Sequence, residues 1–353
     1  MHDEPRPEGQ ADDRSGPTGT STGPTIYEVA ERAGVSIATV SRALRGTGPV
    51  SGRSREKVLK AVEELRFVPN RRGVSLAEGR HAANGVVFPA LSGPYYAEVV
   101  LGYEEATSEL GQSVIILSTD GRGDVESLVR DLAGRVDGMV IFGRTVPDET
   151  VAQLVASGLP VVLLARTPVE GADTLSAENT ATAVRLTEHL LAHGHRRFAL
   201  LGDDAGGDIA ERWDGVRQAL AGHGIVPDPP VPSEFSVEGA YEAAQALLKT
   251  SNRPDVIVCA DDEMALGVLL AAEDAGLDVP GDIAVTGWDD IMAARHARPA
   301  LTTVRQPMRE LGRRAAAALD ELVTGARTDR RHLILPTELV IRSSCGSHPL
   351  EDQ

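Results

Sequence analysis

Acidic and aromatic side chains follow several apolar runs of this sequence at the points where each run ends. Asp261 and Asp262 come directly after I-V-C-A, and Trp288, Asp289 and Asp290 follow V-T-G. Such runs are typical of buried parallel strands, and ligands of open parallel sheets bind outside the carboxyl ends of the strands. Carboxylates bind neighbouring hydroxyl groups, and flat aromatic side chains cover apolar ring faces. We therefore expect a small-molecule site with the chemistry of a sugar site.

The residues of this expected site also have structural alternatives. Asp261 could only cap the helix that begins D-E-M-A-L-G, and Asp289 or Asp290 could cap a short helix after Trp288. Arg212 could form a surface ion pair. Complementary chemistry at neighbouring strand ends favours one common site. The expected small-molecule contacts are Ser92, Tyr95, Tyr96, Arg166, Arg212, Asp261, Trp288 and Asp289.

A stretch near the N-terminus, G-V-S-I-A-T-V-S-R-A-L-R, has the spacing of an amphipathic helix whose outer face could bind DNA. Wound as a helix from Ser36, it places three apolar residues on one side and Ser41, Arg42 and Arg45 on the other. The preceding T-I-Y-E-V-A-E-R-A begins with a capping-box pattern and ends at a glycine that permits a tight turn. Helix, turn and second helix form a helix-turn-helix pattern, although an ordinary helical hairpin has the same spacing.

The distribution of charge favours DNA over the plain hairpin. Residues 25–80 contain eleven Lys and Arg against six acidic residues, whereas the whole chain has a net charge of −17. A basic segment within an acidic protein is what a phosphate-binding module requires. The next helix closes the core with Val58, Leu59, Val62 and Leu65, and Ser51 at its start suits a phosphate contact.

The remaining N-terminal composition and the cysteines narrow the class of protein. Residues 1–24 are rich in Pro, Gly, Ser, Thr and Asp and are expected to be a disordered tail, or an acidic arm that competes with DNA. We expect no signal peptide or transmembrane run, and hence a soluble, cytoplasmic protein.

The two cysteines, Cys259 and Cys345, predict no disulfide, and we expect no cofactor. His193 and His195 could form a metal pair but lack a third ligand at suitable spacing, so no metal site is expected.

From residue 84 onward, short β-rich runs alternate with amphipathic stretches. The runs include G-V-V-F, G-M-V-I-F, P-V-V-L-L, F-A-L-L and D-V-I-V-C. This alternation predicts parallel, doubly wound sheets with helices on both faces, in two similar lobes that open at Gly85 and Phe198. Neither first strand is followed by G-x-G-x-x-G, which argues against a dinucleotide enzyme.

The motifs A-G-V-S-x-x-T-V-S-R, E-K-V and P-N with a following Leu, together with E-R-W-D-G, D-D-E-M-A-L-G and G-W-D-D, resemble the LacI/GalR family of bacterial transcriptional regulators. The resemblance covers Thr25 to about Arg342. It implies a three-helix helix-turn-helix domain plus a hinge helix, followed by an α/β two-lobed, periplasmic-binding-protein-like effector domain. The expected domains are a tail at 1–24, the helix-turn-helix domain at 25–68, the hinge helix at 69–80, a first lobe at 84–165 and 305–330, a second lobe at 166–304 and 331–342, and a tail at 343–353.

The resemblance also implies which residues bind DNA. The hinge helices of two chains would pair in the minor groove, where Leu76 would wedge between base pairs. Gly73 stands where the family commonly has Ala and would weaken that helix by up to about 1 kcal/mol. Arg42 can fork onto a guanine, Ile37 and Ala38 offer apolar contact, and Arg45 adds a phosphate contact. The expected DNA-binding residues are Thr25, Tyr27, Ser36, Ile37, Ala38, Thr39, Ser41, Arg42, Arg45, Ser51, Asn70, Gly73 and Leu76.

For the effector, the resemblance carries contacts to Arg212, Asp261 and Asp289. Three positions depart from the family: Ala165-Arg166 replaces Asp-Arg, Asp261 stands where Asn is commoner, and Glu178-Asn179 replaces Asp-Asn. These departures suggest an effector whose donors differ from the commonest sugars, and it could be cationic.

The sequence therefore predicts a non-enzymatic, homodimeric repressor of near-palindromic operator DNA, controlled by a carbohydrate-like effector. The helix after Met308 would contribute to the dimer face, and the short tail without heptads predicts no tetramerising coil. Two other classes share the two-lobed body or the strand pattern. A transport-type solute-binding protein would need an export signal and no helix-turn-helix. A Rossmann-like enzyme would need the missing glycine fingerprint or a catalytic pair.

Overall fold

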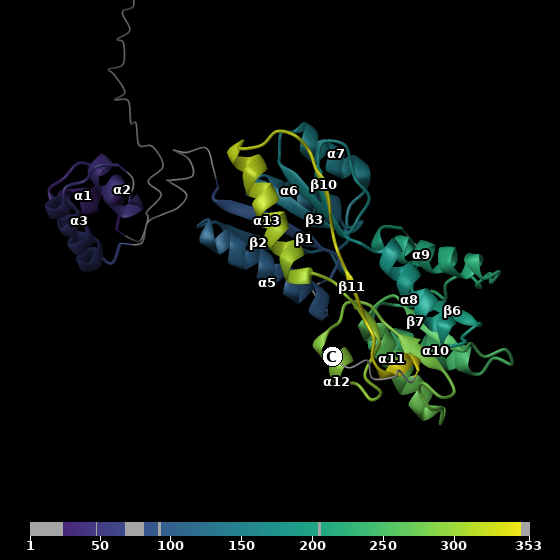
Figure 1. Ribbon diagram of the computed structural model, residues 1–353. Helices are drawn as coiled ribbons and strands as arrows, with labels where there is room; N and C mark the ends of the chain where they lie inside the picture. The colour runs from purple at the N-terminus through teal and green to yellow at the C-terminus, as the bar shows by residue number, and fades with distance from the viewer. Residues whose placement is uncertain (1–23, 47, 68–80, 91–92, 204–205, 347–353) are drawn as a thin grey trace, which may run out of the picture. The chain divides into compact units, whose positions relative to one another are not determined.

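The computed structural model describes residues 24–46, 48–67, 81–90, 93–203 and 206–346, and the chain divides into two compact units, Met1–Gly79 and Arg80–Gln353 (Figure 1). The expected N-terminal tail and the expected hinge helix at 69–80 lie outside the described residues, apart from Pro24. Among the described residues, no helix is both long and apolar enough to cross a membrane.

The N-terminal unit consists of α1 (Ile26–Ala33), α2 (Ile37–Arg45) and α3 (Gly52–Leu65). The capping box at the start of α1 is confirmed, since the Thr25 amide donates to Glu28 Oε2 at 2.6 Å and the Glu28 amide donates to Thr25 Oγ1. Gly34 ends α1 with a left-handed φ of 67°. The buried core of this unit consists of alanine and valine side chains and one aromatic ring: Val29, Ala30, Ala33, Val40, Ala43, Val58, Ala61 and Phe67.

One residue predicted for that core lies outside it. Leu59 is 51% exposed, whereas its neighbour Val58 is fully buried. The two residues are adjacent on one helix and so point about 100° apart, and only one of them can face α1 and α2. The prediction for Leu59 was wrong because the apolar stripe of α3 is narrower than its sequence suggests.

The large unit begins with a six-stranded, fully parallel sheet in the order β10-β5-β4-β3-β1-β2. Alternate residues of β3 enter separate cores on the two faces, as expected for a sheet covered on both sides. Helices α5 and α13 cover one face, and α6 and α7 cover the other. The elements of this first lobe are β1 (Ala83–Phe88), α5 (Pro94–Glu109), β2 (Ser113–Ser118), α6 (Val125–Ala133), β3 (Gly138–Phe142), α7 (Asp148–Ala156), β4 (Val161–Leu164), β5 (Asp173–Ala177), α13 (Met308–Thr324) and β10 (His332–Leu335).

Helices α5 and α13 lie side by side although two hundred residues separate them in sequence (Figure 1). Glycines make this approach possible: a Cβ on Gly312 would collide with the backbone of Val99, and one on Gly102 would collide with the backbone of Arg309. The predicted return of the helix after Met308 to the first lobe is confirmed.

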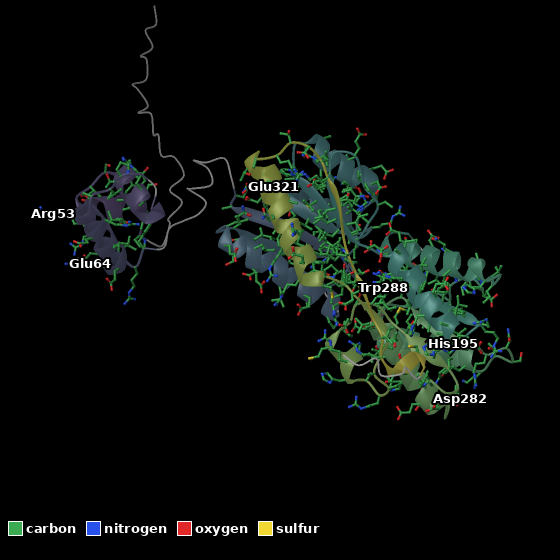
Figure 2. The ribbon with its side chains drawn as sticks, in the orientation of Figure 1. Arg53, Glu64, His195, Asp282, Trp288 and Glu321 are labelled. Atoms are coloured by element: carbon green, nitrogen blue, oxygen red, sulfur yellow. The ribbon has the colours of Figure 1, made fainter. Side chains whose placement is uncertain are left out.

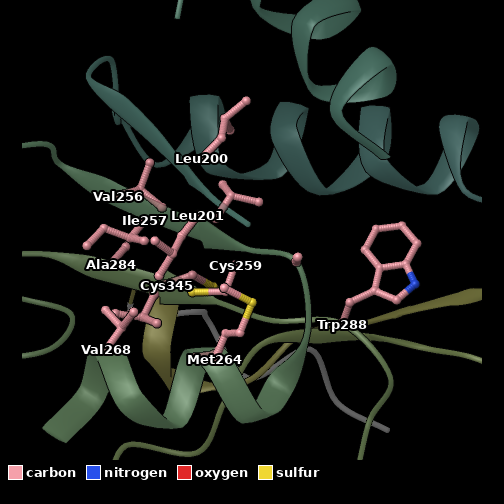
Figure 3. Packing of buried hydrophobic residues seen from close by; sticks show 14 of the residues in the cluster. Leu200, Leu201, Val256, Ile257, Cys259, Met264, Val268, Ala284, Trp288 and Cys345 are labelled. Atoms are coloured by element: carbon pink, nitrogen blue, oxygen red, sulfur yellow. The ribbon is translucent and has the colours of Figure 1, made fainter. Parts of the chain in front are cut away.

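The second lobe has a three-stranded parallel sheet in the order β6-β7-β8. Helix α8 packs against α9, and α10 packs against α11. Figure 3 shows part of its core, where the indole of Trp288 lies at the edge of the aliphatic group. The elements are α8 (Thr180–Ala192), β6 (Phe198–Leu201), α9 (Asp208–Gly222), α10 (Val237–Leu248), β7 (Val256–Cys259), α11 (Asp262–Asp274), β8 (Ala284–Thr286) and α12 (Met292–His296).

The expected lobe boundaries are displaced by two strands. Strands β5 and β10 pair with each other inside the first sheet, so 173–177 and 332–335 belong to the first lobe and not to the second. Strands β9 (Thr303–Arg305) and β11 (Glu338–Val340) form a separate antiparallel pair. The segment from β10 to β11 runs from the first lobe to the second (Figure 1).

The expected tail after residue 342 is partly packed structure. Residues Ser343–Cys345 form a 3-10 turn, η1, in which Ser344 and Cys345 are buried. Ser344 Oγ donates to the carbonyl of Val285 at 2.5 Å and accepts from the amide of Thr302 at 2.9 Å. This turn therefore closes the open edge of the second lobe. Cys259 and Cys345 are both free thiols.

Candidate functional site

The N-terminal unit presents the outer face of α2 to solvent. Ser36, Ile37, Ala38 and Arg42 are exposed, and Thr39 and Ser41 are half-buried. Tyr27 on α1 is 69% exposed, which is unusual for an aromatic side chain without a partner to cover it. These residues form one continuous polar and apolar surface suited to contact another molecule.

Two of the expected DNA-binding residues are held in place by helix capping. Ser36 Oγ accepts a hydrogen bond from the Thr39 amide at 3.2 Å and lies 2.9 Å from Thr39 Oγ1. Ser51 caps α3 in the same way, through the Ser54 amide at 3.2 Å. Amide groups at a helix N-terminus attract anions, so both ends are suited to phosphate oxygens.

The guanidinium of Arg42 is folded back on its own helix. Its Nε donates to the carbonyl of Ala38 at 3.2 Å, and its side chain lies against Gly48. A bidentate contact to a base edge would require this side chain to extend away from the helix. Arg53 at the start of α3 projects from the surface of this unit (Figure 2). The side chain of Arg45, and all of Asn70, Gly73 and Leu76, lie outside the described residues.

The large unit contains a cavity of about 470 Å³ at the carboxyl ends of strands from both of its sheets. Residues that follow β1, β3, β4, β6, β7 and β8 line it, as expected for ligand sites of doubly wound sheets. Its size falls within the usual range for small-molecule pockets. The polar and aromatic lining residues are Tyr95, Tyr96, Phe142, Arg144, Asp203, Asp208, Arg212, Phe235, Asp261, Glu263, Asp289 and Gln306.

Arg212 is the buried cation of this cavity, with only 5% of its surface exposed. Its Nε donates to Asn179 Oδ1 at 3.0 Å and its Nη1 donates to the carbonyl of Ala260 at 2.7 Å. Its Cζ lies 4.7 Å from the ring centroid of Trp288, a cation–π distance. These contacts fix the guanidinium plane, and the surface ion pair considered for Arg212 is excluded by its burial.

Aromatic rings form the wall that the first lobe contributes. Tyr96 meets Phe88, Phe142 and Tyr95 edge to face, with centroids 5.3 to 5.8 Å apart. Burial and, to a smaller extent, the nearby Asp289 raise the pKa of Tyr96 to about 12. Both tyrosines therefore stay neutral and can offer a ring face and a hydroxyl group.

Buried carboxyl groups dominate the wall that the second lobe contributes. Burial raises the pKa of Asp289 to about 7, while Arg212 opposes that rise. Burial likewise raises the pKa of Asp208 to about 6, and it raises the pKa values of Asp261 and Glu263. The ionised forms of these groups lack the hydration or the paired cations that would normally stabilise them.

Asp261 has two roles at once. Its Oδ1 accepts from the Met264 amide at 2.7 Å and caps α11, and the residue also lines the cavity. Asp289 and Asp290 do not cap α12, whose N-cap residue is Ile291 and has no side-chain cap. Instead, Asp289 Oδ1 accepts from Gln306 Nε2 at 2.6 Å.

Asp290 is a structural hub directly beside Asp289. Its carboxylate accepts from Arg295 at 2.9 Å, from Arg305 at 2.7 Å and from Arg342. Burial alone would raise its pKa, but the hydrogen bonds from Arg342, Arg305 and Arg295 together lower it below its ordinary value. Adjacent aspartates thus experience opposite environments: one is ion-paired and the other faces the cavity.

Three of the expected effector contacts are not placed in the cavity lining. Arg166 is buried and pairs with Asp148 and the carbonyl of Val146, beside but not in the cavity. Trp288 lies behind Arg212 and supports its guanidinium. Ser92 lies outside the described residues. Tyr95, Tyr96, Arg212, Asp261 and Asp289 all line the cavity as expected.

Several lining residues were not predicted. Arg144 and Asp203 follow β3 and β6, so the rule that selected the other residues could have found them. Asp208 begins α9 and Gln306 follows β9, positions that no strand-end pattern marks. Among the described residues, no cluster of three or more His, Cys, Asp or Glu side chains has a geometry suited to a metal ion.

Each of the two units matches a known protein family. Residues 25–70 match the model of the bacterial regulatory proteins of the lacI family, and residues 187–345 match the periplasmic binding protein-like domain. Catabolite control protein A of Priestia megaterium is 33% identical over 333 residues, covering 91% of this chain and 98% of that protein. The transcriptional regulator CelR of Thermobifida fusca is 33% identical over 335 residues, covering 91% and 98%.

Solved structures show the same architecture. The lac repressor dimer bound to operator and the anti-inducer ONPF has a TM-score of 0.83 and 30% identity, covering 92% of this chain and all of that one. A CelR–cellobiose complex has a TM-score of 0.69 and 33% identity, covering 91% and 99%. The chain belongs to the LacI family and is a DNA-binding transcriptional regulator with a periplasmic-binding-protein-like body.

Proposed function

We propose that this regulator is a repressor that binds operator DNA as a homodimer and is controlled by a polyhydroxylated small molecule in the cavity. The cavity itself carries this proposal, because its lining combines a fixed guanidinium, carboxyl groups and an aromatic wall at the strand ends of both sheets. Carboxylates and guanidinium groups bind hydroxyl groups, and aromatic rings cover the apolar faces of a sugar. The solved relatives include a cellobiose complex and a ribose complex.

DNA recognition is assigned to α2. Arg42 extends from its folded-back position to bind a guanine edge, and Ile37 and Ala38 contact neighbouring bases. Ser36 and Ser51, at helix N-termini, bind phosphates, and Arg45 adds a further phosphate contact. Leu76 enters the minor groove as a wedge. The lac repressor, a structural relative, is a dimer on its operator, and two copies of α2 would match a near-palindromic site.

Effector and operator binding are coupled through the two lobes. Residues from both lobes line the cavity, so a ligand that contacts both changes the relative stability of their arrangements. Linkage then requires that operator DNA change the effector affinity by the same factor.

A titration of the full-length protein tests this proposal. Operator fragments are first selected from random DNA and then bound at fixed salt, because phosphate contacts make affinity salt-dependent. A library of sugars, polyols and nucleosides is screened by thermal shift, since a bound ligand raises the apparent stability. We expect at least one stabilising compound to change operator affinity at least fivefold. Selection of no DNA sequence, or stabilising compounds without effect on operator affinity, would contradict the proposal.

A further inference from the structure

The lining of the cavity carries more negative than positive charge. Of the described lining residues, five have carboxyl groups, namely Asp203, Asp208, Asp261, Glu263 and Asp289, whereas two have guanidinium groups, Arg144 and Arg212. Arg212 forms no ion pair with any of the five, since its hydrogen bonds go to Asn179 and to the carbonyl of Ala260. The ionised wall therefore has a formal excess of three negative charges.

Arg212 does not neutralise these carboxyl groups by contact. Two of its nitrogens are already used by Asn179 and the carbonyl of Ala260, and its plane lies against Trp288. Its charge acts on Asp208, Asp261 and Asp289 from beyond ion-pair distance. A neutral ligand that displaced water from the cavity would remove solvent screening from this excess charge, and its hydroxyl groups would supply hydrogen bonds but no opposite charge.

A buried acceptor next to Asp289 points to a missing donor. Gln306 is 4% exposed and lines the cavity, its Nε2 donates to Asp289 Oδ1, and its Oε1 is buried without a partner in the described part of the chain. A buried acceptor without a donor is costly, and such groups in native proteins usually have a partner. A ligand donor held between Gln306 and Asp289 would supply it.

The opposite wall is suited to the same kind of donor. Tyr95, Tyr96 and Phe142 present aromatic rings to the cavity. An aromatic face attracts a cation through its quadrupole, and this attraction grows when the cation is removed from water. An ammonium group thus finds carboxylates on one side and ring faces on the other.

We infer that the effector is a polyhydroxylated amine, of the amino sugar or aminocyclitol class, with its ammonium group near Asp289, Gln306 and Asp261. This inference rests on the proposed function for the location of the effector site and adds the charge of the ligand. Hydroxyl groups of the same molecule bind Arg212 and the tyrosines. The family resemblance alone does not decide this, because its effector positions are compatible with neutral sugars.

Matched probes of the full-length protein test the charge directly. D-glucosamine, D-galactosamine and D-mannosamine are each compared with the parent hexose and with the N-acetyl derivative, which keeps the nitrogen but removes the charge. Thermal shift and calorimetry are run at pH 7. We expect at least one amine to bind at least tenfold more tightly than both of its neutral partners, and more weakly as salt is raised. Equal or tighter binding of the neutral partners, or no binding of any amine, overturns the inference.

A pair of variants separates the cavity charge from the charge of the whole protein. Asp261→Asn removes one carboxylate from the wall and keeps the cap of α11, because Asn caps as well as Asp. Asp228→Asn removes one charge from an exposed position outside the cavity. We expect Asp261→Asn to weaken binding of the amine at least fivefold more than it weakens binding of the neutral partner, and Asp228→Asn to change neither. Equal effects of the two variants on amine binding would refute a local role for the charge.

The outcomes for the two proposals are distinguishable. If neutral sugars bind and change operator affinity while the amines do not, the inference fails and the proposed function stands. If an amine binds as expected but operator affinity does not change, the ligand class is supported and effector control fails. The pH dependence gives a further check. The titratable and charged groups near Asp289 are Arg212, Asp261, Asp262, Glu263, Tyr95 and Tyr96. Amine affinity should fall as pH is lowered from 7.5 to 5.5, whereas affinity that rises would overturn the inference.

Discussion

Replacing Asp289 by Asn should stabilise the ligand-free protein. Burial raises the pKa of Asp289 from 3.8 to about 7, and Arg212 lowers it only in part. A tenfold change in an ionisation constant corresponds to about 1.4 kcal/mol, so the ionised form costs roughly 4 kcal/mol at pH 8. Asparagine is neutral, has nearly the same shape and keeps an oxygen for the Gln306 hydrogen bond.

The sign follows from proton linkage. The folded protein holds a proton on Asp289 between about pH 4 and pH 7, where the unfolded chain has released it. The wild-type protein therefore loses stability as pH rises through this window and loses no more above about pH 7. The advantage of Asp289→Asn is near zero at pH 4 and greatest at pH 8.

We expect a gain of roughly 2 to 4 kcal/mol for the large unit at pH 8, because the NH2 group of the asparagine must also be buried and offsets part of the gain. For a unit of this size that gain raises Tm by about 5 to 10 °C. Calorimetry of the full-length protein at pH 5, 6, 7 and 8 measures it, and Asp228→Asn controls for the loss of one negative charge. A lower Tm of Asp289→Asn at pH 8, or a difference that does not grow with pH, would refute the reasoning.

Three further substitutions have defined outcomes. Asp290→Asn should lower stability by about 2 to 4 kcal/mol at pH 7, because it removes the buried carboxylate that Arg295, Arg305 and Arg342 share. The pKa of Asp290 is lowered, so the loss of stability should shrink as pH falls below about 4. Chemical denaturation at pH 7 and at pH 3.5 measures the loss at each pH. An unchanged denaturation midpoint at pH 7 would contradict a structural role for the Asp290 carboxylate. Arg42→Ala should relax operator choice by about 1 to 3 kcal/mol at one base position in binding titrations of single-base operator variants, whereas equal losses on every sequence would mean a phosphate contact. Leu76→Ala should reduce operator bending in a circular-permutation gel assay, and an unchanged bend would remove the wedge.

Most of the fold could be predicted because its strands are continuous apolar runs and its helices are amphipathic. The runs G-V-V-F, G-M-V-I-F, P-V-V-L-L, F-A-L-L and D-V-I-V-C coincide with β1, β3, β4, β6 and β7, and a helix follows most of them as the predicted alternation requires. Strands β5 and β10 were missed for a physical reason. Asp173–Ala177 contains three polar residues whose side chains are buried by partners elsewhere in the chain, and three of the four residues of His332–Leu335 are exposed. Neither has the apolar pattern of a central strand, and the lobe boundaries were displaced as a result.

The site could be predicted only as far as backbone position determines it. The strand-end rule led to Tyr95, Asp261 and Asp289, which line the cavity, because a parallel sheet brings its carboxyl ends together. Side-chain direction was not available from the sequence: Arg166 follows β4 but turns to Asp148, a partner eighteen residues earlier. Gln306 could not be found at all, since its place beside Asp289 depends on an isolated bridge between Asp289 and Arg305, which are far apart in the predicted pattern.

The contrast between Asp289 and Asp290 suggests how a ligand reaches the rest of the molecule. Asp289 faces the cavity and gains stability when a ligand cation or donor compensates its buried charge. Asp290, the next residue, is fixed by Arg305 of β9 and by Arg342, which follows β11. The chain crosses between the lobes next to these two strands, so a small movement of Asp289 is transmitted through one peptide bond to the connections between the lobes. Asp290→Asn should therefore weaken the effect of any effector on operator affinity by more than it weakens effector binding itself.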